Sequence, residues 1–302
     1  MSKTHHLQLH LAQPPGAVFA MLIRAPELSA WFCEHAEDAR EQMIFWGRYT
    51  PLVPQRPQGG RTIHARVPDE RLHFDWEMLD TLSQVNIQLI PDSAGTRLSL
   101  VHSQIPVGFP IWMEDFWFLS LENLRRHLDG KTVDRFDFSA IQPGPYSHTL
   151  GVDAPPEAVW RALTEPGELE RWIASRAQVE PEREGKYSYG WPVPGPVRIL
   201  DLEPGRRLST QWASWEREPA SVVTWELEGS GGKTRLTIVH SGFADDFDSS
   251  GTQVGWLNFM NWLRSSVEYG PSWVPPLSRL SEEMLPYYPA SIAESQGELG
   301  EY

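Results

Sequence analysis

Residues 14–32 read PPGAVFAMLIRAPELSAWF, and residues 155–173 read PPEAVWRALTEPGELERWI. The two stretches align without a gap at an offset of 141, and eight of their 19 positions are identical. Each opens with a proline pair, which is well tolerated in the first turn of a helix. Apolar residues then recur at helical spacing, so each stretch predicts a helix and a second short helix that ends at Trp31 or Trp172.

The self-similarity continues along the chain in the same order. Residues 96–103 read TRLSLVHS and residues 234–241 read TRLTIVHS, with six of eight positions identical at an offset of 138. Residues 67–76 also match residues 203–212 at an offset of 136. A period near 140 residues is too long for a solenoid repeat and suits two whole domains. The small changes in offset indicate insertions in loops.

These matches divide the 302 residues into three parts. A Pro/Gly-rich stretch at Ile141–Pro145 is typical of a linker, so we expect a first domain over residues 1–140 and a second over residues 141–275. Residues 276–302 have no counterpart in the first repeat. They are rich in proline and glutamate, and we expect an extended acidic tail with a disordered end.

Each repeat predicts the same order of elements. A short alternating strand precedes the two helices, strands separated by Gly, Pro and Asp turns follow, and a long helix closes the repeat. The apolar stripes of the two closing helices share one spacing and are Trp117, Leu121, Leu124 and Leu128, then Trp256, Met260, Leu263 and Val267. The expected fold class is α+β: two tandem helix-grip domains, each a curved antiparallel sheet wrapped around a long C-terminal helix.

Composition narrows the classes of partner and cofactor. The net charge of -14 argues against nucleic acid and against an anionic membrane surface. Cys33 is the single cysteine, so an intramolecular disulfide or a cysteine-based zinc site cannot form. The His, Asp and Glu residues show no ligand spacing, so neither a metal nor a cofactor is expected. Without a signal peptide or an apolar run of membrane-spanning length, we expect a cytoplasmic protein.

The order of elements and several motifs resemble the SRPBCC superfamily, also called START-like or helix-grip. Within it, the chain is similar to the AHSA-type branch, named after the activator homologue of the heat-shock-protein ATPase. The residues that carry the resemblance in the second repeat are Pro155-Pro156, Val159-Trp160, Trp172, Gly185-Lys186-Tyr187, Thr234-Arg235-Leu236, His240-Ser241-Gly242-Phe243 and Gly255-Trp256. The first repeat is more divergent. The resemblance implies the fold, but it does not choose among carriers, cyclases and co-chaperone domains.

His102 and His240 occupy equivalent positions in the two repeats. Side chains alternate along a strand, so each histidine shares its face with two apolar residues and should point inward beneath the closing helix. One interpretation is a polar anchor for a ligand or a general acid/base. The other is a structural histidine bonded to the backbone or to the helix, and its presence in both repeats favours this second interpretation.

The chain holds 14 Trp residues. Most are expected in the cores, whereas Tyr187, Trp191 and Trp212 of the second repeat are candidates for the wall of a ligand pocket. Trp76 is the counterpart of Trp212 in the first repeat. The expected ligand-binding residues are thus His240, Tyr187, Trp191 and Trp212, with His102 and Trp76 in the first repeat.

Three functions remain open from the sequence. The leading hypothesis is a non-catalytic protein that binds a small hydrophobic or aromatic molecule in a cavity between sheet and closing helix, with the second repeat as the better candidate. The first alternative is a polyketide cyclase/aromatase-like enzyme that uses His240 or a nearby tyrosine as acid/base. The second alternative, suggested by the co-chaperone resemblance, is a protein-interaction module that uses its surface.

Overall fold

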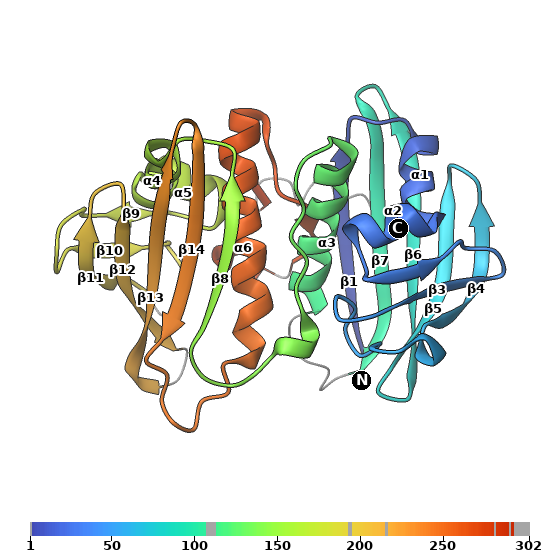
Figure 1. The fold of residues 1–302 in the computed structure, drawn as a ribbon, viewed down its shortest axis with the longest axis horizontal. Helices are drawn as coiled ribbons and strands as arrows, with labels where there is room; N and C mark the ends of the chain where they lie inside the picture. Colours follow the sequence, from blue (N-terminus) through green and yellow to red (C-terminus); the bar gives the residue numbers. More distant parts are fainter. Residues whose placement is uncertain are drawn as a thin grey trace. The chain divides into compact units, whose positions relative to one another are not determined.

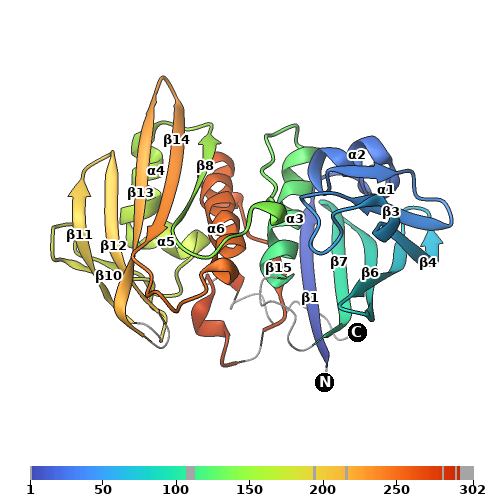
Figure 2. The same ribbon diagram turned by 60° about the horizontal axis from the view of Figure 1, so that its bottom comes forward.

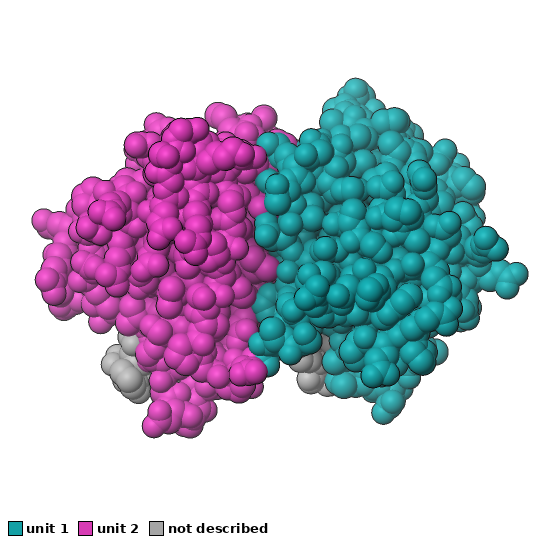
Figure 3. Space-filling model, viewed as in Figure 1, with its two compact units in different colours: residues 1–141, 276–279 teal, residues 142–275, 280–302 magenta. Residues whose placement is uncertain are grey.

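The computed structural model describes residues 2–106, 113–192, 195–214, 217–280, 282–289 and 291–292. The chain forms two compact units, coloured separately in Figure 3. Unit 1 comprises Met1–Ile141 and Pro276–Arg279, and unit 2 comprises Gln142–Pro275 and Leu280–Tyr302. Both units are α+β, and each is a helix-grip domain with an antiparallel sheet and a long helix, as the sequence predicts.

Unit 1 contains one eight-stranded sheet with the order β15-β1-β7-β6-β5-β4-β3-β2. Every pair of neighbouring strands is antiparallel. Its long helix α3 lies beside β1 (Figure 1). The elements are β1 (Ser2–Leu11), α1 (Pro15–Ile23), α2 (Ala25–Trp31), β2 (His35–Glu37), β3 (Gln42–Trp46), β4 (Gly60–Val67), β5 (Arg71–Met78), β6 (Thr81–Asp92), β7 (Gly95–Pro106), α3 (Met113–Leu128) and β15 (Leu277–Ser278), with 3-10 turns at Arg56–Gln58 and Phe138–Ala140.

Unit 2 repeats this topology with the strand order β8-β14-β13-β12-β11-β10-β9. Its long helix α6 lies beside β8 (Figure 1). The elements are β8 (Tyr146–Val152), α4 (Pro156–Thr164), α5 (Pro166–Trp172), β9 (Gln178–Val179), β10 (Lys186–Ser188), β11 (Val197–Glu203), β12 (Arg207–Ser214), β13 (Arg217–Ser230), β14 (Lys233–Ser241) and α6 (Ser250–Tyr269), with 3-10 turns at Gly270–Ser272 and Leu285–Tyr287.

The two short helices of each unit are held together by the tryptophan that ends the second one. The indole Nε1 of Trp31 donates a hydrogen bond of 3.1 Å to the carbonyl of Met21, and Trp172 donates one of 2.9 Å to the carbonyl of Ala162. Both indoles are buried. A large apolar ring with one donor can therefore fill the core and also satisfy a carbonyl of the preceding helix.

The strand pairing shifts register at equivalent places in the two units. The pairing of β4 with β5 shifts between Ile63 and Ala65, and that of β11 with β12 shifts between Ile199 and Asp201. The offset is 136 in each case, as in the sequence repeat. A bulge increases the local twist of a strand, which helps the sheet to curl.

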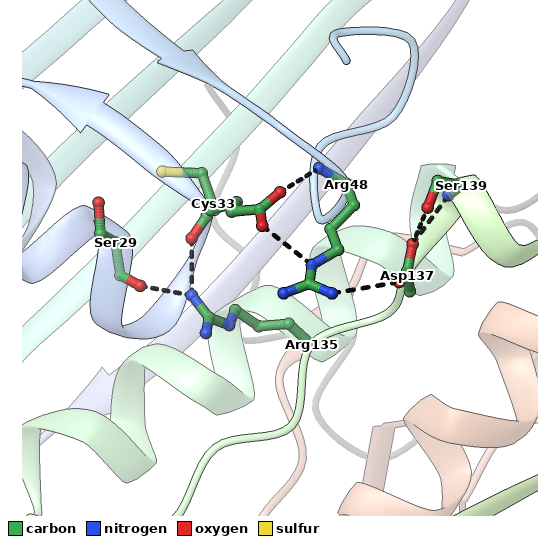
Figure 4. Close-up of polar contacts among 7 residues, drawn as sticks. Ser29, Cys33, Arg48, Arg135, Asp137 and Ser139 are labelled. Atoms are coloured by element: carbon green, nitrogen blue, oxygen red, sulfur yellow. Dashed lines mark hydrogen bonds and ion pairs between the residues drawn. The ribbon is translucent and has the colours of Figure 1, made fainter. Parts of the chain in front are cut away.

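The segment after α3 is tied to unit 1 by two arginines (Figure 4). Arg135 donates hydrogen bonds to the carbonyls of Ser29 and Cys33 at the C-terminal end of α2. Those carbonyls have no partner within the helix, so the guanidinium serves as a cap. Arg48 forms an ion pair of 3.0 Å with Glu34 and lies 3.9 Å from Asp137. Each charged group of this cluster has a partner, so the cluster attaches the segment after α3 to the rest of unit 1.

The segment expected to be a tail begins with ordered structure. Strand β15 pairs with β1 at the edge of the sheet of unit 1, with Leu277 opposite Gln8 and Ser278 opposite Leu7 (Figure 2). Ser278 is fully buried and donates to the carboxylate of Glu114. From Leu280 onward the chain belongs to unit 2. The acidic end, residues 293–302, lies outside the described residues.

Candidate functional site

A chain of hydrogen bonds runs through the core of unit 1 and has His102 at its centre. The indole Nε1 of Trp117 on α3 donates to His102 Nδ1 at 2.9 Å, and His102 Nε2 lies 2.9 Å from Ser83 Oγ. Ser83 Oγ in turn donates to the carbonyl of Trp76 at 2.6 Å. An indole can only donate, so Nδ1 carries no proton and the neutral ring is protonated on Nε2.

Unit 2 contains the same chain of hydrogen bonds. Trp256 Nε1 on α6 donates to His240 Nδ1 at 3.0 Å, His240 Nε2 lies 2.8 Å from Ser221 Oγ, and Ser221 donates to the carbonyl of Trp212 at 3.0 Å. One feature is particular to unit 2: Tyr146 Oη lies 3.1 Å from His240 Nδ1.

Burial keeps both imidazoles neutral. His102 and His240 are almost completely inaccessible to solvent. Desolvation lowers the pKa of each from its ordinary value of 6.5 to about 3, and His5 adds a smaller effect at His102. The expectation that both histidines point inward beneath the closing helix is confirmed. Both ring nitrogens of each histidine are engaged, so the geometry favours the structural interpretation.

The serines of these hydrogen-bonded chains are not among the residues that the sequence predicts for the site. Ser83 and Ser221 are separated by 138 residues, which is also the separation of His102 and His240. Extending the repeat to polar residues on the neighbouring strand would have found them. The conspicuous signal, a histidine repeated at the same inner position, thus marks a buried connection between the sheet and the long helix.

The aromatic candidates of unit 2 form one continuous cluster. The Tyr189 ring lies 5.2 Å from the ring of Tyr187, 4.9 Å from that of Trp191 and 5.9 Å from that of Trp212. Trp212 then reaches the His240 ring at 6.1 Å. The structure therefore brings together all four candidates of the second repeat. Tyr189, which was not predicted from the sequence, contacts three of them.

This aromatic cluster lies between the sheet and α6. Trp191 contacts the ring of Phe259 on α6 at 6.3 Å, and Trp212 contacts that of Trp256 at 4.8 Å. Backbone acceptors fix two of the polar ends: Tyr187 Oη donates to the carbonyl of Leu163 at 2.9 Å, and Trp191 Nε1 donates to that of Ile173 at 3.3 Å. Tyr187 and Trp191 are buried, whereas Trp212 is half-buried.

The corresponding region of unit 1 contains the predicted Trp76 and also a buried arginine, Arg61, that was not predicted from the sequence. Trp76 is fully buried and stacks on His102 with ring centres 5.8 Å apart. Arg61 of β4 extends into the same core, where its guanidinium lies 5.0 Å from the centre of the Trp76 ring. The register of β4 shifts between Ile63 and Ala65, so the alternation of its residues did not predict that an arginine faces inward.

The described part of the chain contains no group of three or more His, Cys, Asp or Glu side chains that could hold a metal ion. No helix there is both long enough and apolar enough to cross a membrane.

Comparison with known proteins gives one decisive match. The family model described as Activator of Hsp90 ATPase homolog 1-like protein matches the chain twice, over residues 12–129 and 153–268. None of the curated proteins matches the chain. Together the two matched segments cover well over half of the 302 residues.

Three solved structures are similar to parts or all of the chain, with low TM-scores. MLL2253 from Mesorhizobium loti is 27% identical, with 41% of this chain and 98% of that chain covered and a TM-score of 0.36. The Aha1 dimer from Colwellia psychrerythraea is 20% identical, with 42% and 98% covered and a TM-score of 0.39. DynU16, a protein of the dynemicin biosynthetic locus, is 13% identical, with 98% and 99% covered and a TM-score of 0.38. TM-scores this low support no inference about function.

The resemblance noted from sequence motifs is therefore supported by two matches to the family model, one in each unit, and the chain belongs to the family of Activator of Hsp90 ATPase homolog 1-like proteins.

Proposed function

We propose that the chain binds a small hydrophobic or aromatic molecule between the sheet and the long helix of unit 2. The observation that supports this most is the convergence of Tyr187, Tyr189, Trp191 and Trp212 in one aromatic cluster against α6. Trp212 is only half-buried, so this residue keeps some contact with solvent. Aromatic walls with few polar groups are typical of sites for such molecules.

His240 contributes to this site by holding Trp212 and Trp256 in position. Its ring lies 6.1 Å from that of Trp212, and its Nδ1 accepts from Trp256. A histidine with a pKa of about 3 and both nitrogens engaged is a weak base and a poor proton carrier. The cyclase/aromatase alternative therefore gains no support from His240.

The test uses the intact protein and the neutral fluorescent probe N-phenyl-1-naphthylamine. We expect the probe to bind with an increase in its fluorescence, and Trp212→Ala to weaken binding by about tenfold because apolar contact area is lost. Trp46→Ala is the matched control, since Trp46 is also a half-buried strand tryptophan but belongs to unit 1. Equal affinity in Trp212→Ala and the native chain would reject the site. Native mass spectrometry of freshly purified protein can identify a retained natural ligand.

A surface function is the second candidate, because unit 1 exposes two leucines at one hairpin. Leu79 and Leu82, where β5 turns into β6, are each 57% exposed. The family description refers to activation of the Hsp90 ATPase. We expect any binding to Hsp90 through this hairpin to be lost in the double variant Leu79→Ser, Leu82→Ser. A pull-down in which neither the native chain nor the variant retains Hsp90 rules this candidate out.

A further inference from the structure

Unit 1 contains a buried arginine whose charge has no counterion among the residues that the structure describes. Arg61 is 4% exposed. Its Nη1 donates to the carbonyl of Phe45 at 3.1 Å and to that of Gly59. Its guanidinium carbon lies 3.4 Å from the centre of the Phe45 ring and 5.0 Å from that of Trp76. Cation–π attraction to these rings offsets part of the cost of burial but provides no acceptor for the remaining N–H groups.

Three donors in this neighbourhood lack a hydrogen-bond partner among the described residues. They are Nε and Nη2 of Arg61 and the indole Nε1 of Trp76. Nε and Nη2 form one edge of the guanidinium, which is the edge that binds a carboxylate through two parallel hydrogen bonds. All three free groups are donors, so a matching ligand must bring acceptors.

The protein side chains nearby do not neutralise the arginine. The ionisable neighbour that acts on it is Cys33. Burial raises the pKa of the Cys33 thiol to about 12, so this thiol is uncharged at neutral pH. Desolvation lowers the pKa of Arg61 to about 9, which still leaves the guanidinium protonated at neutral pH. A buried charge without a partner is strongly unfavourable, so an anionic ligand at Arg61 would remove a large energetic cost.

Unit 2 shows that the fold itself does not need this arginine. Arg61 of β4 is paired with Met43 of β3, and the same register in unit 2 pairs Val197 of β11 with Tyr187 of β10. The bulges that follow on β4 and β11 align at the same offset of 136. An apolar residue thus occupies the equivalent buried position in unit 2.

We propose that unit 1 binds a small monocarboxylate with an apolar body, whose carboxylate accepts hydrogen bonds from Nε and Nη2 of Arg61 and whose body lies against Phe45 and Trp76. The single negative charge of such a ligand neutralises the charge of Arg61. The Trp76 indole Nε1, which has no partner among the described residues, is a further donor in this core. This site is separate from the aromatic cluster of unit 2 and does not depend on it.

The experiment compares matched charged and neutral probes by isothermal titration calorimetry on the full chain. The probes are phenylacetate and decanoate, with phenylacetamide and decanamide as neutral counterparts. We expect at least one carboxylate to bind at least tenfold more tightly than its amide. Arg61→Met should abolish this preference, and Arg61→Lys should reduce it because lysine keeps the charge but lacks the planar edge.

A second measurement distinguishes a binding arginine from a structural one. Without ligand, Arg61→Met should unfold at the same or a higher temperature than the native chain, because an uncompensated buried charge is removed. Trp212→Ala, which alters the site proposed in unit 2, should leave the carboxylate preference of the native chain intact. The inference is overturned if neither carboxylate binds, if Arg61→Met keeps the preference, or if Arg61→Met is markedly less stable.

Discussion

Trp256 Nε1 donates a hydrogen bond of 3.0 Å to His240 Nδ1, and this bond joins the long helix of unit 2 to its sheet. Trp117 and His102 form the same bond in unit 1 at 2.9 Å. The surroundings differ in one respect. Tyr146 Oη lies 3.1 Å from His240 Nδ1, whereas the described residues offer His102 Nδ1 no second donor. Both units therefore have the same bond between long helix and sheet. In unit 2 the histidine has Tyr146 as a second potential donor, here called the reserve donor, and in the described part of unit 1 it has none.

Removal of the indole N–H should cost more in unit 1 than in unit 2. Trp117→Phe leaves His102 Nδ1 buried without a donor, which costs about 1–3 kcal/mol beyond the loss of ring contacts. In Trp256→Phe, Tyr146 can rotate its hydroxyl hydrogen from Thr252 to His240 and replace part of the lost bond. Urea denaturation of the two variants should differ by about 1 kcal/mol.

Tyr146→Phe supplies the control for this comparison. Added to Trp256→Phe, it should raise the cost in unit 2 to that seen in unit 1, because the reserve donor is gone. Equal destabilisation by Trp117→Phe and Trp256→Phe, with no further effect of Tyr146→Phe, would show that Tyr146 does not compensate.

The same histidines predict a loss of stability in acid. Their pKa is about 3 in the folded chain and near 6.5 when unfolded, so between these values the unfolded state binds protons that the folded state does not. The free energy of unfolding should therefore fall as pH drops below about 6.5, by roughly 1 kcal/mol per pH unit for each histidine. Asp115 acts in the opposite direction, since burial beside Glu114 raises its pKa to about 7.

A difference measurement isolates one histidine. The free energy of unfolding is measured by urea denaturation from pH 4 to pH 7 for the native chain and for His240→Asn. Its slope with pH should be smaller in the variant by roughly 1 kcal/mol per pH unit. Identical slopes would mean that His240 is not held neutral in the folded state.

Repetition at a fixed offset made most of the fold predictable. The helix pairs that end at Trp31 and Trp172 and the two closing helices follow from matched blocks with a clear 3.6-residue period. The inward orientation of His102 and His240 follows from strand alternation. The sequence could not reveal β15, because two residues are too few for a period and their partner β1 lies far away in the chain. It also gave no sign of Arg61, since nothing in unit 2 repeats it.

Cys33 should be inert in the folded protein. It is fully buried, its Sγ lies 3.5 Å from the carbonyl of Leu28, and burial raises its pKa to about 12. The thiolate is the reactive form, so alkylation at pH 8 should require opening of unit 1. As the single cysteine, it reports on that unit alone. Pulsed alkylation with iodoacetamide should follow unfolding in urea, and rapid labelling without urea would contradict the buried placement.

Strand β15 should protect the edge of the sheet of unit 1. The amide of Arg279 donates to the carbonyl of His6 at 2.9 Å, next to the pairs that β15 makes with β1. Arg279→Pro removes this donor, and Arg279→Ala keeps it, so their difference isolates the backbone bond from any effect of the side chain. We expect faster amide hydrogen exchange along β1 in the proline variant only. An exposed edge strand pairs readily with other chains, so this variant should also self-associate at high concentration. Unchanged exchange in β1 would mean that β15 merely lies beside the sheet without stabilising it.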